Sequence, residues 1–205
     1  EAEALNKALK RVTGDLVNWL NADDMYLPGA LEAVASQVEG DAILYGRTEF
    51  MDKDSRFLAI HRPPSQLSMS CLTHFWGTLL WQPSMFMTRK VMETTGAFRE
   101  DLHYSIDYEY WLRMARRFPF KYVDGILSRS RIRAGAKSWG TLMNQVRSHR
   151  EVVKPYLCDL TPSQRVSFWA GYHLHARPRW AVVEGFGRLG FQPPLRGTLV
   201  PWLIS

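Results

Sequence analysis

Two adjacent carboxylates, Asp23 and Asp24, follow a short apolar segment at residues 16–20. The segment predicts a buried strand, and the polar residues 21–24 predict a turn directly after it. Carboxylates in this position lie where α/β sheets bind ligands, and such oxygens hold Mg²⁺ or Mn²⁺ together with substrate phosphates. A solvent-exposed turn with an Asp capping the next helix explains the same residues. Taken alone, the pair leaves both interpretations open.

A second carboxylate, Asp107, stands near the start of a predicted helix at residues 106–117 that is rich in aromatic residues. Apolar rings around a carboxylate raise its pKa toward the value that a general base needs. The same position also favours a carboxylate for a structural reason, because the amino end of a helix is electropositive. Asp107 is therefore a candidate general base or an ordinary helix-start residue.

Four basic residues, Arg129, Arg131, Arg133 and Lys137, lie on and after a predicted strand at residues 126–132. Arginine binds phosphate oxygens through paired hydrogen bonds, although a solvated basic face accounts for the cluster equally well. The charge is uneven along the chain, since residues 1–60 hold 6 Lys and Arg against 11 Asp and Glu, whereas residues 111–205 hold 16 against 4. The basic second half predicts an anionic partner, which could be nucleic acid, lipid headgroups or nucleotide phosphates.

The elements that must position these residues alternate along the first part of the chain. A helical period runs from Ala2 to Val12 and stops near Gly14, and a strand follows at residues 16–20. A second helix begins at Pro28, and a second strand at residues 42–45 ends at Gly46. This alternation predicts an α/β layer with parallel strands.

Further elements follow downstream. We expect a hairpin at residues 49–59, strands at 85–88, 120–123 and 126–132, and helices at 91–95, 106–117 and 139–153. Two amphipathic stretches lie beyond Ser163 and are separated by Pro178.

The composition fits one folded domain. The chain has 205 residues, of which 46% are hydrophobic and 22% charged, and this excludes a disordered protein. Charged residues interrupt every apolar run before the roughly 20 residues that a membrane span needs, and residues 1–14 lack the pattern of a secretory signal. We expect Cys71 and Cys158 to be buried free thiols, because they form no disulfide framework or metal motif.

Taken together, these motifs resemble the family 2 glycosyltransferases, which are inverting enzymes with the GT-A fold. The blocks that carry the resemblance occur in the family's order at residues 4–8, 14–31, 82–86, 91–98, 107–113 and 131–138. They span roughly residues 2–155.

The resemblance implies an α/β fold with a GT-A-like, Rossmann-like mixed sheet flanked by helices. It also implies that the chain is N-terminally truncated, because the family's strand and loop that hold the nucleotide base precede the matched blocks. Residues 1–155 would form a partial GT-A domain with the metal site and the catalytic base. Residues 156–205 would form a helical C-terminal extension that packs on the domain or contacts a membrane surface.

The resemblance also implies roles for individual residues. Asp23 and Asp24 would hold Mg²⁺ or Mn²⁺, and Asp107 would be the general base. The remaining candidates would bind substrate or its diphosphate: Asn6, Asn21, Asp23, Gln82, Trp111, Arg131 and Lys137. Among them, Arg131 and Lys137 would face the diphosphate, whereas Gln82 and Trp111 would line the acceptor side.

The implied reaction moves a sugar from a nucleotide-diphosphate donor to a hydroxyl of a glycan or lipid-linked acceptor with inversion. Such a protein would act in cell-surface polysaccharide or glycolipid synthesis, in the cytoplasm or peripherally at the inner face of the membrane. The truncated sheet edge would be covered by self-association or by a partner.

Two other functions remain open. The chain could be a catalytically inactive fragment, a scaffold or binding protein that retains part of the GT-A fold. Binding of nucleic acid through the basic tail is a third hypothesis, but we expect no nucleic acid partner because no nucleic-acid-binding module is recognisable.

Overall fold

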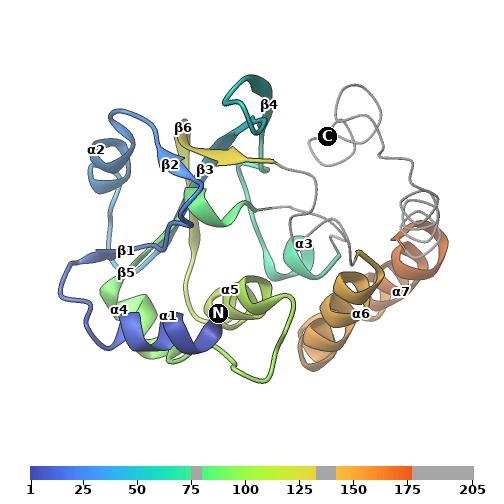
Figure 1. Cartoon of the computed structure of the whole chain (residues 1–205). Helices are drawn as coiled ribbons and strands as arrows, with labels where there is room; N and C mark the ends of the chain where they lie inside the picture. Colours follow the sequence, from blue (N-terminus) through green and yellow to red (C-terminus); the bar gives the residue numbers. More distant parts are fainter. Residues whose placement is uncertain (75–79, 133–141, 177–205) are drawn as a thin grey trace.

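The computed structural model describes residues 1–74, 80–132 and 142–176. These residues form a mixed sheet with helices on both faces (Figure 1). The strands are β1 (Leu16–Val17), β2 (Met25–Tyr26), β3 (Ile43–Met51), β4 (Phe57–His61), β5 (Met85–Thr88) and β6 (Phe120–Arg131). The α-helices are α1 (Ala2–Leu9), α2 (Ala30–Ala35), α3 (Met69–His74), α4 (Arg89–Thr95), α5 (Ile106–Ala115), α6 (Leu142–Val153) and α7 (Pro162–Ala170). Shorter helical segments are η1 (Gln82–Ser84), η2 (Lys154–Asp159) and η3 (Gly171–Ala176).

The sheet has the strand order β1-β5-β3-β6-β2, and β4 pairs with the second half of β3. Only the pair of β3 and β6 is parallel among the described strands, whereas the other pairs are antiparallel. The expectation of parallel strands from the helix–strand alternation holds for direction, since β1 and β3 run the same way, but it is wrong for pairing because these two strands are not neighbours. Its physical reason is that β5 comes later in the chain but pairs between β1 and β3, which separates the two strands that the alternation would have made neighbours.

Two strands continue where the sequence predicted an end, at Gly46 and at the gap between residues 123 and 126. β3 passes through Gly46, and β6 passes through Gly125 as one strand instead of two. A Cβ atom at Gly46 would lie 2.7 Å from Leu127 Cδ1, which is too close for any real contact. Gly46 is therefore a site of close strand approach, and the register of β3 and β6 shifts next to it.

Gly46→Ala is expected to lower the free energy of unfolding by about 1–3 kcal/mol, because the added methyl group overpacks the β3–β6 contact. Denaturant unfolding would measure the loss. Gly14→Ala is the matched control, since its Cβ would meet only the Leu16 carbonyl at an ordinary 3.6 Å. Equal stabilities of the two variants would contradict the close-approach explanation.

The sheet separates two hydrophobic cores. Alternate side chains of β3 point to opposite faces, so that Ile43 and Tyr45 join the larger core and Leu44 joins the smaller one. Helix α2 covers the smaller core with Ala30 and Val34. The other α-helices contribute to the larger core on the opposite face (Figure 1).

Several local predictions are confirmed. The hairpin between β3 and β4 turns at residues 52–55, where Asp52 Oδ1 accepts hydrogen bonds from the backbone of Asp54 at 2.8 Å and Arg56 at 2.9 Å. Strand β5 matches its expected bounds, and α4 ends at Gly96, whose φ of 79° suits glycine.

The described segments at residues 154–176 pack on the same core as the sheet. Tyr156 of η2, Phe168 of α7 and Tyr172 are all buried, and Phe168 and Tyr156 belong to the larger core. Residues 177–205 of the expected C-terminal extension lie outside the described residues, so the role of residues 156–205 and the domain boundary at residue 155 stay predictions. Within the described residues, no helix is both long and apolar enough to span a membrane.

Both cysteines are exposed, and the prediction that they are buried is wrong. On α3, Leu72 and Thr73 face the interior, which places Cys71 on the outer side of a short helix. In η2 the buried residue is Tyr156, and the Cys158 thiol lies 3.3 Å from the Pro155 carbonyl oxygen at the surface. Hydrophobicity alone does not show which side of a single helical turn a residue occupies.

Candidate active site

The loop at residues 18–24 crosses from the end of β1 to the end of β6. Strands β1, β3 and β6 run in the same direction, because β5 is antiparallel to both β1 and β3, and β6 is parallel to β3. Their carboxyl ends consequently share one edge of the sheet. There Asp24 Oδ1 accepts hydrogen bonds from Ser130 Oγ at 2.6 Å and from the Arg131 backbone N–H at 3.1 Å. The structure thus fixes one candidate metal ligand against the end of the central β6.

Side-chain amides fix the rest of this loop. Asn18 donates to the Pro83 carbonyl at 2.9 Å, and Asn21 donates to Gln82 Oε1 at 3.3 Å and to Asp24 Oδ2 at 3.2 Å. The Gln82 amide in turn donates to Asn18 Oδ1 at 3.3 Å and to the Trp19 carbonyl. Gln82 is buried and both ends of its amide are used within the protein. The structure therefore gives Gln82 a role in shaping the loop, and its expected contact with an acceptor stays a prediction.

A buried cluster of three hydroxyl groups fixes η1, the short helical segment that contains Gln82. Ser84 Oγ lies 2.7 Å from Thr48 Oγ1 of β3 and 2.6 Å from Ser128 Oγ of β6, and it also donates to the Arg47 carbonyl at 2.9 Å. All three hydroxyl residues are at most 1% exposed. Because each buried hydroxyl has a partner, the cluster ties η1 to both central strands without an unsatisfied polar group.

Helix α5 carries Asp107 in its first turn and lies against the loop. The ring of Trp19 meets Tyr110 edge-on, with 6.4 Å between the centroids, and Phe98 at 5.0 Å. One oxygen of Asp107 accepts the backbone N–H of Tyr108 at 2.8 Å. The Asp107 side chain is only partly buried, so the site combines a fixed carboxylate with access from outside.

Trp111 lies one helical turn after Asp107 on the same face of α5. Its side chain is 6% exposed, and its indole Nε1 is buried without a hydrogen-bond partner among the described residues. A buried donor of this kind costs free energy unless a ligand accepts from it. The expected position of Trp111 on the acceptor side stays a prediction.

The orientation of α5 is set by packing and by one internal ion pair. The Tyr110 and Phe98 rings stack at 4.0 Å, and burial raises the pKa of Tyr110 to about 12. Arg113 Nε lies 2.9 Å from the buried Glu109 carboxylate, and its guanidinium donates to the carbonyls of Thr95 and Ala97. Glu109 is thus buried in an ion pair of the scaffold, whereas the Asp107 side chain on the same helix is only partly buried.

Asn6 lies away from this loop, on α1. Its amide donates to the Phe98 carbonyl at 3.0 Å and to Glu100 at 2.8 Å, and its oxygen accepts the Phe98 N–H at 2.7 Å. These bonds attach α1 to the segment after α4. The expected substrate contact of Asn6 stays a prediction, but the structure shows a structural role for its whole side chain.

Asn6→Ala is expected to lower the free energy of unfolding by about 1–3 kcal/mol, because the backbone groups of Phe98 lose their partners. The KM for a donor should not change. Thermal or denaturant unfolding, together with donor kinetics, would check both statements. Asn144→Ala on the exposed side of α6 is the control. A raised KM at unchanged stability would instead favour direct substrate contact.

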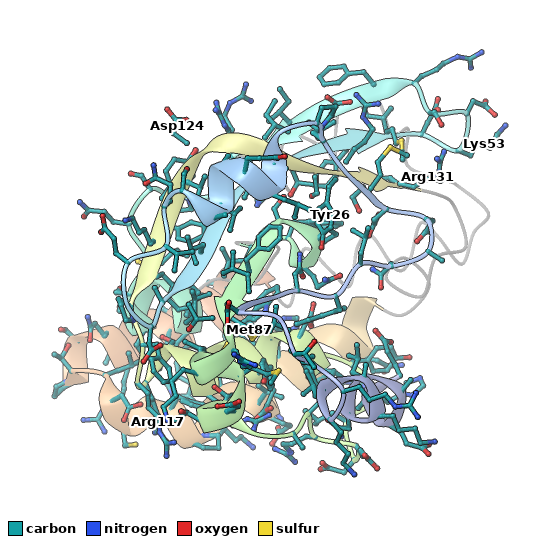
Figure 2. The ribbon with its side chains drawn as sticks, turned by 90° about the vertical axis from the view of Figure 1, so that its left-hand side faces the viewer. Tyr26, Lys53, Met87, Arg117, Asp124 and Arg131 are labelled. Carbon is teal, nitrogen blue, oxygen red and sulfur yellow. The ribbon has the colours of Figure 1, made fainter. Side chains whose placement is uncertain are left out.

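The two basic side chains near the end of β6 already have partners within the protein. Arg131 Nη1 donates to the carbonyls of Asp52 and Lys53 at 3.1 and 3.0 Å, and Figure 2 shows Arg131 beside the hairpin turn that carries Lys53. Arg129 Nε lies 2.6 Å from Glu49 Oε1. The Arg131 side chain therefore braces the hairpin, while its backbone N–H reaches Asp24. Its contact with a diphosphate stays a prediction, and Lys137 lies outside the described residues.

Sequence reasoning missed Ser130 and Trp19, which connect the candidate residues. Ser130 follows Ser128 by two positions along β6, and this alternation placed both hydroxyls on the buried side. That spacing was the available signal for Ser130. No spacing in the sequence indicates that Trp19 packs on α5, because the contact spans distant parts of the chain.

The donor set fits a hard divalent cation that is completed by a substrate. Asp23 and Asp24 supply adjacent carboxylates, and among the described residues no group of three or more His, Cys, Asp or Glu side chains gathers for a metal. Mg²⁺ and Mn²⁺ are commonly held by one or two carboxylates plus phosphates, so two carboxylates suffice. Asp24 Oδ1 is already oriented by two donors, which leaves Oδ2 as its less occupied oxygen.

Comparison with known families identifies this architecture. The model of glycosyl transferase family 2 matches residues 1–121, which is more than half of the chain. The chain therefore belongs to glycosyl transferase family 2.

Relatives agree with this assignment. An uncharacterized glycosyltransferase of Rickettsia conorii is 28% identical over 180 residues, and the alignment covers 75% of this chain and 30% of the relative. One of Rickettsia prowazekii is 25% identical over 181 residues, with 83% and 56% covered. The chain thus spans about a third to a half of the length of these relatives.

Solved structures define the fold. The crystal structure of S. aureus TarS aligns with a TM-score of 0.59 at 13% identity, covering 99% of this chain and 38% of TarS. TarS 1-349 in complex with UDP-GlcNAc aligns with a TM-score of 0.58 at 14% identity, covering 97% and 57%. The mixed sheet flanked by helices is GT-A-like, as the sequence predicted.

Proposed function

We propose that this chain is the metal-binding and catalytic-base part of a glycosyltransferase that moves a sugar from a nucleoside-diphosphate donor to a hydroxyl acceptor with inversion. Family membership supports transfer of a sugar, and the TarS complex with UDP-GlcNAc supports a nucleotide-sugar donor. The observation that carries the proposal is the position of Asp24. It is bonded to the end of β6, in a loop that packs directly against α5, the helix that carries Asp107 in its first turn.

Asp107 would act on the acceptor. Its carboxylate takes the proton of the acceptor hydroxyl, and the hydroxyl oxygen forms a bond to the anomeric carbon of the donor sugar. The bond between that carbon and the diphosphate oxygen breaks, and its electron pair leaves with the diphosphate. Because the attack comes from the face opposite the leaving group, one displacement inverts the anomeric configuration.

The loop at residues 18–24 would hold the leaving group. Asp23 and Asp24 would bind Mg²⁺ or Mn²⁺, which when bound stabilises negative charge on the diphosphate. Ser130 and the Arg131 N–H fix Asp24 through one oxygen, and Asn21 contacts the other. A ligand set oriented before binding loses little free energy to reorganisation.

The acceptor and the location belong to the same proposal. We propose a glycan or lipid-linked acceptor in the synthesis of a cell-surface polysaccharide or glycolipid, at the cytoplasmic face of the membrane. The excess of Lys and Arg in residues 111–205 supports contact with anionic headgroups. β1 is an edge strand of the described sheet, and we propose that self-association or a partner covers it.

The test is a transfer assay with the purified protein and a panel of UDP-, GDP- and dTDP-sugars, with Mn²⁺, Mg²⁺ or EDTA. We expect metal-dependent release of the nucleoside diphosphate, and a product whose anomeric proton coupling in NMR shows inversion. Retention of configuration would refute the single displacement. Absence of Mn²⁺-dependent binding of UDP, GDP and dTDP in calorimetry would favour the alternative, a scaffold that retains the fold without activity.

A further inference from the structure

The two residues that precede α5 are held by the neighbouring helix α6. Ser148 Oγ donates to the Tyr104 carbonyl at 3.0 Å, and His149 Nδ1 lies 3.3 Å from Ser105 Oγ. Both contacts join residues 44 positions apart in the sequence. Adjacent side chains on one helix therefore fix the backbone immediately before the Asp107 turn, where α5 and α6 lie against each other (Figure 1).

The backbone at Ser105 is strained, and the hydrogen bond between Ser105 and His149 explains this conformation. Ser105 has φ 59° and ψ 29°, which is the left-handed region that non-glycine residues rarely adopt. Ser105 occupies the N-cap of α5, yet its hydroxyl makes no capping bond to the helix. The hydroxyl is directed to His149 instead, and the cap is left to Asp107, which accepts the Tyr108 N–H. A helix start built this way depends on α6 for its geometry.

His149 contacts a second residue next to Asp107. Its ring lies on the Tyr108 ring with centroids 4.4 Å apart. Tyr108 is buried and donates its hydroxyl to the Leu72 carbonyl of α3 at 2.6 Å, and burial raises the pKa of that hydroxyl, so that it stays a donor. His149 therefore touches the residues on both sides of the Ile106–Asp107 pair.

We infer that His149 is a positioning residue for Asp107. By holding Ser105 through a hydrogen bond and Tyr108 through ring packing, it fixes the first turn of α5 and so the direction of the Asp107 carboxylate. The role in catalysis rests on the proposed function, whereas the ordering of the α5 start by His149 does not. Since general-base catalysis depends on alignment, a loosened first turn should slow the proton transfer without weakening donor binding.

The experiment distinguishes the hydrogen bond of His149 to Ser105 from the packing of its ring on Tyr108. His149→Phe keeps a ring against Tyr108 but removes the bond to Ser105, and Ser105→Ala removes the other end of the same bond. Each variant is expected to lower kcat about 10-fold, with the donor KM within about 2-fold of the wild type, because misalignment affects the reacting atoms. The double variant should be no slower than either single variant, since one bond is lost in all three.

A second measurement does not depend on activity. Amide hydrogen exchange of the peptide covering residues 105–112 should become faster in both single variants, and unchanged in Arg147→Ala, which alters an exposed residue of the same helix. Unchanged exchange and unchanged kcat in both variants would overturn the inference. A fall in kcat with a parallel rise in KM and loss of thermal stability would also overturn it, in favour of general destabilisation. If the wild type transfers no sugar, the proposed function fails, and the exchange data alone decide whether His149 orders the α5 start.

Discussion

Replacement of Asp107 by Asn is expected to lower kcat for sugar transfer by about 10²–10⁴-fold, because an amide cannot take the proton of the acceptor hydroxyl. The fold should be unaffected. The Asn oxygen can still accept the Tyr108 N–H that Asp107 accepts at 2.8 Å, so the first turn of α5 keeps its cap. Initial rates over a range of donor and acceptor concentrations would show whether the loss lies in kcat, as expected, or in KM.

Asp101→Asn is the matched control for this variant. Asp101 lies in the segment before α5 and pairs at the surface with Arg99 at 2.5 Å. It loses the same charge at a similar place in the chain, and its transfer rate should stay within about 2-fold of the wild type because surface ion pairs contribute little. Undiminished transfer by Asp107→Asn would show that another group is the base.

Asp24→Asn is expected to weaken Mn²⁺-dependent binding of a nucleoside diphosphate by at least about 10²-fold. The loss of a negative ligand removes most of the attraction for the cation. The amide nitrogen also meets a donor on either side, since Ser130 and the Arg131 N–H donate to one oxygen of Asp24 and Asn21 donates to the other. Calorimetric titration of UDP and GDP, each with and without Mn²⁺, would measure the difference.

Two further variants, a milder one and a control, accompany Asp24→Asn. Ser130→Ala keeps the carboxylate but removes its shortest hydrogen bond, and a loss of an orienting partner typically weakens metal binding about 10–100-fold. Glu32→Gln removes an exposed carboxylate from α2 and should have no effect. If Asp24→Asn binds nucleoside diphosphate and Mn²⁺ as tightly as Glu32→Gln, Asp24 is not a metal ligand.

Much of the fold follows from local sequence signals. The hairpin turn at residues 52–55, the short strand β5 and the end of α4 at Gly96 each depend on neighbouring residues, and each was predicted correctly. The errors in the sheet concern long-range pairing. The sequence cannot show that β5 inserts between β1 and β3, or that a glycine lies inside a strand because another strand approaches it closely.

The candidate site shows the same difference between local sequence signals, which predict correctly, and long-range contacts, which they miss. The types and order of Asp23, Asp24 and Asp107 indicated their chemistry, and the structure places the loop of the first two against the helix of the third. The partners that orient them come from far along the chain, as with Ser130, which is 106 residues from Asp24. For Asn6 the family resemblance, and for Arg131 also the residue type, suggested a ligand contact, whereas the structure shows bonds to backbone carbonyls.

The amides of Asn18, Asn21 and Gln82 give the loop at residues 18–24 a property that regular secondary structure lacks. A strand tolerates many side chains because its backbone makes the bonds, but here each amide is the partner of another. A change at one position leaves a donor or an acceptor of the next unmatched, whereas a compensating change restores the pair. Substitutions at the three positions should therefore be coupled. We expect compensating double substitutions to be tolerated where the single substitutions are not.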